Sequence, residues 1–170
     1  FDISHMGQLE VSGKFATNWL NLVLTNNIEK LAIGEGQYTF LLNRDGGVID
    51  DLIVYRRAVE SYFLVVNAAK IEEDAAWLEQ EITLNVELNN VSVHYGALAV
   101  QGPKSAEVLG VFGELPRRNH ILEFRIDGID GLIARTGYTG EDGFELFFPA
   151  IAMPQIWNRI LDLGKIAGIR

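Results

Sequence analysis

The chain has 170 residues, 48% of them hydrophobic, which suits one compact domain or two tightly fused halves. It contains no cysteine, which excludes disulfide bonds, thiolate metal ligands and cysteine nucleophiles. The net charge of −9, without any run of basic residues, argues against nucleic acid and anionic membranes as partners.

Strands and helices alternate along the first half of the chain. We expect a strand that ends at Gly13, followed in order by a helix, a hairpin, a strand and a second helix, at 14–24, 38–54, 62–66 and 71–82. The hairpin is indicated by two apolar runs on either side of a Gly-rich acidic turn. The second helix is indicated by Ile71, Ala75 and Leu78, which recur at helical spacing.

The second half repeats this order. Gly102, like Gly13, follows an apolar strand and precedes a helix, which is expected to begin at Pro103. A hairpin and a tryptophan-bearing helix follow at 132–148 and 153–164, and further strands fit 84–88, 91–95, 98–101 and 121–126. We therefore predict an α+β fold of two repeated β-α-β-β-α-like subdomains with mostly antiparallel or mixed sheets, divided into residues 1–90 and 91–170.

Two adjacent acids, Asp50 and Asp51, lie in an apolar strand of the first hairpin. A buried carboxylate costs several kcal/mol unless it is paired or hydrogen-bonded. Because side chains alternate along a strand, Asp51 shares a face with Tyr55, and we expect this face to line a ligand cleft. The ordinary alternative is that one aspartate ends the turn and accepts backbone hydrogen bonds while the other faces water; we expect the turn-end role for Asp50.

Glu145 raises the same question in the second hairpin. The repeat is expected to place Glu145 at the position that matches Asp51, on the opposite side of one central cleft. From the residues alone, Glu145 fits a half-exposed strand position as well as it fits a ligand-facing one. Its neighbours Phe144, Leu146 and Phe148 are expected to occupy the opposite face of the strand.

Three polar residues are further candidates, each with an ordinary alternative. Asn67 ends a strand ahead of a helix, where its default role is that of an N-cap. Tyr38 and Tyr138 lie near the two hairpins and fit core positions equally well. The glycines around Tyr138, in RTGYTGEDG, would let the backbone approach a ligand or would form a bulged hairpin loop.

The usual cofactor and metal motifs do not occur in the sequence. GEGQYT has Thr39 where a dinucleotide-binding fingerprint requires its third glycine, and no serine lies in a G-x-S-x-G elbow. His5, His94 and His120 are scattered, so no metal site is predicted. The residues alone indicate an apolar, aromatic-walled cleft with two carboxylates, suited to a flat, nitrogen-rich ligand.

Several of these segments together resemble a known family. The resemblance is to the aminomethyltransferase, or T-protein, of the glycine cleavage system, and it is carried in the family's order by FDISHMGQLEVSG, LTNNIEKLAIGEGQYTFLLNRDGGVIDDLIVYR, FLVVNAAKIEEDAAWL, LAVQGPKSAEVL and ARTGYTGEDGFELFFP. It implies the folate-binding fold and a tetrahydrofolate-dependent enzyme. The family reaction takes the aminomethyl group on the lipoyl arm of H-protein, yields 5,10-methylenetetrahydrofolate and ammonia, and leaves a dihydrolipoyl arm.

The resemblance also implies roles for individual residues. Asp51 matches the family's key aspartate beside N5 and N10 of the folate, where it would position the nucleophilic nitrogen and stabilise charge. Glu145 matches the glutamate that hydrogen-bonds the pterin. The remaining matches line the folate pocket: Tyr38, Tyr55, Asn67 and Tyr138.

Sibling enzymes of the same fold remain as alternatives. A folate-dependent demethylase, or the folate domain of a dimethylglycine or sarcosine enzyme, would share the folate residues and differ in the donor. The motif RTGYTGEDGFE and the lack of a flavin signature favour the T-protein. A non-enzymatic folate-binding paralogue of iron–sulfur assembly relies on a cysteine motif, which this chain lacks.

The ends of the chain differ from the family's pattern. Full family members have a segment before the FDISHM motif, and a GARD-type segment and a further domain downstream, so we expect the chain to be a fragment. No apolar run approaches the ~20 residues of a membrane-spanning helix, and no signal peptide is recognisable. We expect a soluble protein, cytoplasmic in a bacterium or in the mitochondrial matrix of a eukaryote.

Overall fold

The computed structural model describes residues 1–169, which form two compact units. The first unit is Met6–Ser92, and the second combines Phe1–His5 with the residues from Val93 onward. None of the helices in the described residues is long and apolar enough to cross a membrane. The assignment of residues 1–90 and 91–170 as two folate-binding subdomains stays a prediction.

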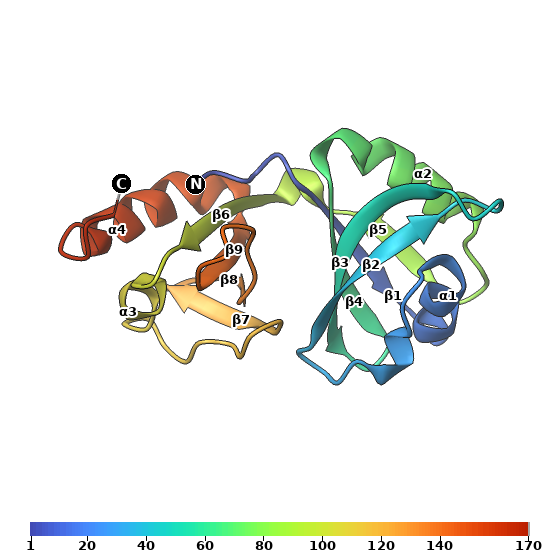
Figure 1. The fold of residues 1–170 in the computed structure, drawn as a ribbon, viewed down its shortest axis with the longest axis horizontal. Coiled ribbons are helices and arrows are strands. Elements are labelled where there is room, and N and C mark those ends of the chain that lie inside the picture. Colours follow the sequence, from blue (N-terminus) through green and yellow to red (C-terminus); the bar gives the residue numbers. More distant parts are fainter. Residues whose placement is uncertain (170) are drawn as a thin grey trace. The chain divides into compact units, whose positions relative to one another are not determined.

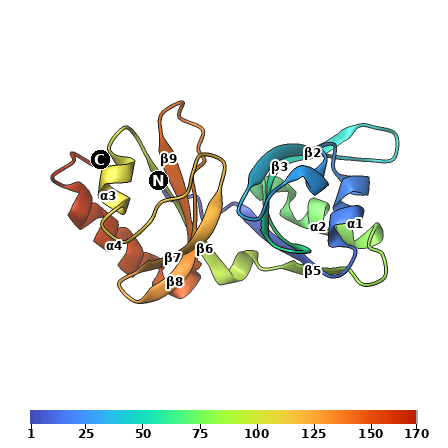
Figure 2. The same ribbon diagram turned by 90° about the horizontal axis from the view of Figure 1, so that it is seen from below.

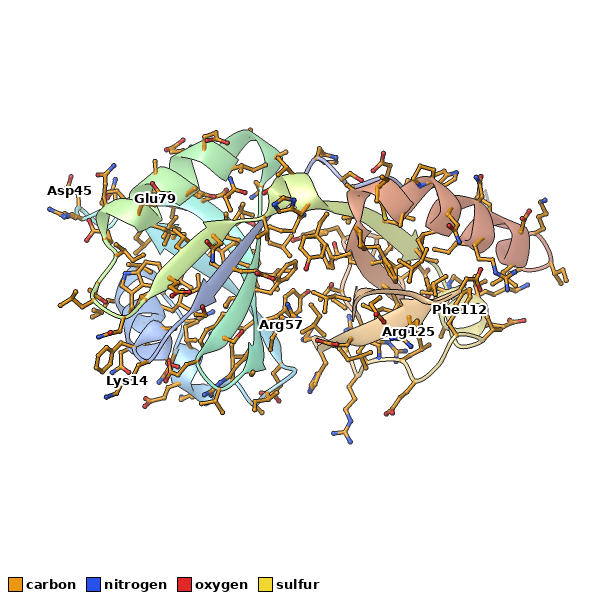
Figure 3. The ribbon with its side chains drawn as sticks, turned by 180° about the vertical axis from the view of Figure 1, so that it is seen from behind. Lys14, Asp45, Arg57, Glu79, Phe112 and Arg125 are labelled. Atoms are coloured by element: carbon orange, nitrogen blue, oxygen red, sulfur yellow. The ribbon has the colours of Figure 1, made fainter. Side chains whose placement is uncertain are left out.

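The first unit is a five-stranded antiparallel sheet with two α-helices (Figure 1). Its elements are β1 (Gly7–Ser12), α1 (Ala16–Val23), β2 (Gly36–Leu42), β3 (Val48–Ala58), β4 (Ser61–Val66), α2 (Ile71–Gln80) and β5 (Glu87–Asn90), with short 3-10 helices at Ile28–Lys30 and Ala68–Lys70. The strand order is β2-β3-β4-β1-β5. Asp45, labelled in Figure 3, lies at the tip of the hairpin that joins β2 and β3.

The second unit is a four-stranded antiparallel sheet, also with two α-helices. Its elements are β6 (Tyr95–Gln101), α3 (Ser105–Leu109), β7 (Ile121–Ile126), β8 (Ile129–Ala134), β9 (Gly143–Pro149) and α4 (Met153–Gly164), with a short 3-10 helix at Ala150–Ala152. Another 3-10 helix, Ser92–His94, contains the boundary between the two units along the chain. The strand order is β6-β9-β8-β7.

In each unit, alternation along the strands directs apolar side chains to a core beneath the two helices. In the first unit, Leu52 and Val54 of β3 join Leu20 of α1 and Leu78 of α2 in one core, so both helices lie on the same side of the sheet (Figure 2). Burial of side chains of this size stabilises the fold by about 1.5–3 kcal/mol each. The predicted inward positions Ala75 and Leu78 are therefore confirmed.

The predicted repeat is confirmed by the topology. The strand order β2-β3-β4-β1 of the first unit reappears as β7-β8-β9-β6 in the second, and each unit carries its helices after equivalent strands. Gly13 and Gly102 both adopt a left-handed φ, +119° and +120°, at the turn between the first strand and the first helix. Such a φ favours glycine, which explains why the turn repeats in the sequence.

The repeat does not make Asp51 and Glu145 equivalent, so that prediction was wrong. Asp51 lies in β3, whose counterpart by strand order is β8, whereas Glu145 lies in β9, the counterpart of β4. Three consecutive antiparallel strands give two strand-turn-strand patterns in each unit. The predicted match therefore paired the β2–β3 hairpin of the first unit with the β8–β9 hairpin of the second, although the counterpart of β2–β3 is β7–β8.

Some predicted boundaries were also wrong. Helix α3 begins at Ser105, because Pro103 lies in a turn closed by the Ser105 N–H, which donates to the Gly102 carbonyl at 3.0 Å. The strands predicted at 84–88 and 91–95 are replaced by β5 and a 3-10 turn at Ser92–His94. Asn85, with a φ of 64°, interrupts the first of these runs.

Candidate functional site

Strand β3 carries two carboxylates on opposite faces. Asp50 is 7% exposed and lies on the core face with Leu52 and Val54, whereas Asp51 is half-buried on the other face. In the ladder, Asp51 pairs with Phe40 of β2, just beyond a register shift between Leu41 and Leu42. The predicted alternation along this strand is confirmed.

Asp51 accepts hydrogen bonds from two of the predicted site residues. The Asn67 amide Nδ2 lies 3.3 Å from Asp51 Oδ1 and 3.0 Å from the Asp51 backbone carbonyl oxygen. The Tyr38 hydroxyl donates to the Asp51 carboxylate, and this hydrogen bond raises the pKa of Tyr38. Because Tyr38 is 47% exposed, the cluster of Asp51, Asn67 and Tyr38 is open to solvent on this face of the sheet.

Asn67 has a different role from its default one. It occupies the N-cap position of the 3-10 helix Ala68–Lys70, but its side chain makes no capping hydrogen bond. The side chain instead donates to Asp50 Oδ1 at 2.9 Å, in addition to its bonds to Asp51. Asn67 therefore occupies the predicted N-cap position without capping through its side chain, whose Nδ2 is bound to Asp50 and Asp51 instead.

Asp50 does not end the turn, so the turn-end role predicted for it was wrong. The turn is already complete at Val48, so Asp50 lies two residues inside β3, on the core face. Asn67 donates to it twice, through its side chain at 2.9 Å and through its backbone N–H to Oδ2 at 3.2 Å. The expected backbone hydrogen bond is thus present, but the donor comes from beyond β4 rather than from the turn.

A third acid, Asp74 of α2, was missed by the sequence analysis. Its side chain is wholly buried, and its carboxyl group lies within hydrogen-bonding reach of the Asp50 carboxyl group. Burial, followed by the hydrogen bond and charge of Asp50, raises the pKa of Asp74 from 3.8 to about 8. The burial of Asp74 could have been predicted from the sequence, because Asp74 lies between Ile71 and Leu78 on the inward-facing side of α2.

Glu145 is a buried acid with one described donor. It is 6% exposed in β9, and the Thr136 hydroxyl donates to its Oε2. Burial raises the pKa of Glu145, and the hydrogen bond from Thr136 partly offsets this effect. None of the hydrogen bonds within residues 1–169 is donated to the second carboxylate oxygen, Oε1. Phe144 and Phe148 of the same strand are in the core of the second unit, as predicted.

The two remaining tyrosines have contrasting surroundings. Tyr55 is fully buried in β3 and packs over Gly36 of β2, where an added Cβ would lie 2.3 Å from the Tyr55 ring. Tyr138 is 73% exposed in the Gly-rich loop before β9. At the base of this loop, Arg135 donates to both carboxylate oxygens of Asp142, at 2.9 and 2.6 Å. Ligand contacts by Tyr55 and Tyr138 stay predictions.

The arrangement in the first unit has a definite chemical capacity. Asp51 is a half-buried carboxylate fixed by an amide and a phenol, and it can accept a hydrogen bond or a proton from a nitrogen of a bound molecule. No cluster of three or more His, Cys, Asp or Glu residues suited to a metal ion occurs in the part of the chain that the structure describes.

Comparison with known sequences gives consistent matches. The chain matches the family described as GCVT N-terminal domain over residues 1–170. An aminomethyltransferase from Exiguobacterium sibiricum is 48% identical over 98% of this chain, and one from Halalkalibacterium halodurans is 43% identical over 99%. These matches cover 47% and 48% of the two relatives, so the chain spans about half the length of the curated relatives it matches.

Solved structures show the same similarity. The crystal structure of glycine cleavage system aminomethyltransferase T from Bartonella henselae superposes with a TM-score of 0.85 at 36% identity, over 95% of this chain and 44% of that one. The heterotetrameric sarcosine oxidase from Corynebacterium sp. U-96 superposes with a TM-score of 0.75 over 99% of this chain and 84% of that one. At 14% identity, this second match shows a shared fold alone.

Proposed function

The chain belongs to the GCVT N-terminal domain family, and from this premise we propose that the intact protein is an aminomethyltransferase of glycine cleavage. It takes the aminomethyl group from the lipoyl arm of H-protein and releases 5,10-methylenetetrahydrofolate and ammonia. Support comes from the name and the 43–48% identity of the curated relatives, and from the T-protein structure that superposes on this chain.

The observation that carries the proposal is the environment of Asp51. A strand carboxylate without a functional role would be expected to face water freely. Asp51 is instead half-buried and fixed by hydrogen bonds from Asn67 and Tyr38. Such fixation holds one carboxylate oxygen in a defined direction, which general acid–base catalysis and electrostatic stabilisation both require. In the proposed reaction, Asp51 orients the accepting nitrogen and stabilises positive charge as the carbon changes partners.

The residues present fit tetrahydrofolate as the acceptor. A pterin presents N–H donors along one edge, and Glu145 Oε1 accepts no hydrogen bond from residues 1–169. Because Glu145 is buried, a charge-assisted hydrogen bond there is stronger than one in water. Tetrahydrofolate supplies the nucleophilic nitrogen. The protein residues bind and orient it, with Tyr38, Tyr55, Asn67 and Tyr138 proposed as further contacts.

The test is a transfer assay on the intact protein. Aminomethylated, lipoylated H-protein and tetrahydrofolate are supplied together, and 5,10-methylenetetrahydrofolate and ammonia are both measured. The proposal expects both products in equal amounts, and neither when H-protein lacks its lipoyl group. Turnover from sarcosine or dimethylglycine, without turnover from H-protein, would instead assign the protein to a sibling activity of the same fold.

A further inference from the structure

The buried acid of α2 has no ordinary donor. Asp74 is 0% exposed, and neither of its carboxyl oxygens accepts a hydrogen bond from a donor within the described residues. Its neighbour is the Asp50 carboxyl group, within hydrogen-bonding reach. Two carboxylates cannot hydrogen-bond to each other without a proton between them, and two adjacent buried negative charges repel strongly.

The surrounding charges do not remove the need for that proton. The titratable groups that act on Asp74 are Asp50 from β3, Glu73 from its own helix and Lys70 from the preceding turn. Lys70 Nζ is already bound to Glu73 Oε2 at 2.6 Å, on the exposed side of α2. The raised pKa of Asp74, about 8, agrees with a carboxyl group that is protonated at neutral pH.

The Asp74–Asp50 pair is connected to Asp51 by one side chain. Asn67 Nδ2 lies 2.9 Å from Asp50 Oδ1 and 3.3 Å from Asp51 Oδ1, and the Asn67 backbone N–H lies 3.2 Å from Asp50 Oδ2. Asp50 therefore holds Asn67 at two atoms, and Asn67 in turn holds Asp51. A displacement of Asp50 would be passed to Asp51 through this amide.

We propose that Asp74 is a positioning residue for Asp51: it shares one proton with Asp50, and the paired Asp50 holds Asn67 against Asp51. The role in catalysis depends on the proposed function, whereas the shared proton does not. Loss of the proton turns a neutral–negative pair into two negative charges in the core, which pushes Asp50 away from α2 and loosens its hold on Asn67.

The shared proton is tested without any activity measurement. Infrared spectra of the intact protein at neutral pH are recorded for the wild type and for Asp74→Asn. The difference spectrum should contain the carbonyl stretch of one protonated carboxylic acid, shifted in deuterated water. Asp50→Asn should lose the same band, because an amide at position 50 can donate to an ionised Asp74. A difference spectrum without this band overturns the proposal.

The positioning role is tested by transfer kinetics of the intact protein. Asp74→Ala should lower kcat about tenfold or more with little change in KM for tetrahydrofolate, because misplacement of a catalytic group costs mainly turnover. Asp74→Asn, which can still donate a hydrogen bond to Asp50, should recover most of this loss. In the wild type, ionisation of Asp74 should lower kcat as the pH rises through about 8. Asp74→Asn has no proton to lose at this position and should not show this decline. The matched control is Leu78→Ala, which removes a wholly buried side chain from the same helix and should leave the pH profile unchanged.

Failure of this proposal is distinguishable from failure of the proposed function. If Asp51→Asn abolishes transfer while Asp74→Ala keeps the wild-type kcat, Asp74 does not position Asp51, and the proposed function stands. If Asp51→Asn transfers normally, Asp51 has no catalytic role and the positioning role of Asp74 fails with it, whereas the proposed function fails only if the wild type gives no turnover from H-protein. If Asp74→Ala does not fold, the comparison between Asp74→Asn and the wild type decides, since an unaltered pH profile in Asp74→Asn contradicts the role.

Discussion

Replacement of Asp74 by asparagine should change how the stability of the first unit depends on pH. In the folded protein the pKa of Asp74 is about 8, against 3.8 for an unperturbed aspartate, because the side chain is buried beside Asp50. Between these two values the folded state binds a proton that the unfolded state does not. The stabilisation of the folded state by this bound proton is therefore fully present below about pH 3.8 and is lost as the pH rises through about 8.

The size of the effect follows from proton linkage. One proton bound only by the folded state lowers the free energy of unfolding by about 1.4 kcal/mol for each unit of increase in pH. From about pH 5 to about pH 7, Asp74→Asn should gain roughly 3 kcal/mol of stability relative to the wild type. The difference between the two proteins is the useful quantity, because the other titrating groups contribute equally to both.

Native-state hydrogen exchange of the intact protein is the suitable assay. The amides of α2 and β3 report the opening of the first unit, whatever other domains are present, once the intrinsic pH dependence of exchange is corrected. Glu73→Gln provides a control, because it removes a neighbouring charge and keeps Asp74. A difference in stability between Asp74→Asn and the wild type that stays constant across this pH range would show that the folded protein does not hold this proton on Asp74.

Three further predictions concern the candidate site. Glu145→Ala should weaken tetrahydrofolate binding by about 2 kcal/mol, measured by calorimetry, and Glu141→Ala in the exposed loop should not; equal affinities would refute the pterin assignment. Asn67→Ala should destabilise the first unit by about 2 kcal/mol in hydrogen exchange and lower kcat, because buried Asp50 loses its side-chain donor and keeps only the backbone N–H of residue 67. Tyr38→Phe should lower kcat less than tenfold, since its hydroxyl donates to Asp51 from an exposed position; a loss as large as that of Asp51→Asn would contradict this ranking.

The fold was predictable because its signals are local. Glycines with a left-handed φ mark the same turn in both units, at Gly13 and Gly102, and helical spacing marks α2 and α4. The alternation that separates Asp50 from Asp51 is a local property of β3. Strand equivalence between the units was not predictable in this way, because three consecutive antiparallel strands contain two similar hairpins.

The candidate site was predictable only in part. That Asp51 faces away from the core followed from alternation, but its bonds to Asn67 and Tyr38 depend on how β2, β3 and β4 pair. The Asp50–Asp74 contact depends on how α2 packs on the sheet, which no local pattern gives. An acid at an inward helical position was nevertheless a warning that the core contains a partner for it.

The most direct test of the central claim measures transfer and binding in the same Asp51→Asn protein. Asparagine has the size of aspartate but lacks its charge, so the sheet and the hydrogen bond from Tyr38 can be preserved. We predict that formation of 5,10-methylenetetrahydrofolate falls by at least about a hundredfold, while the affinity for tetrahydrofolate changes by only a few fold. Turnover equal to that of the wild type would show that Asp51 has no part in the reaction.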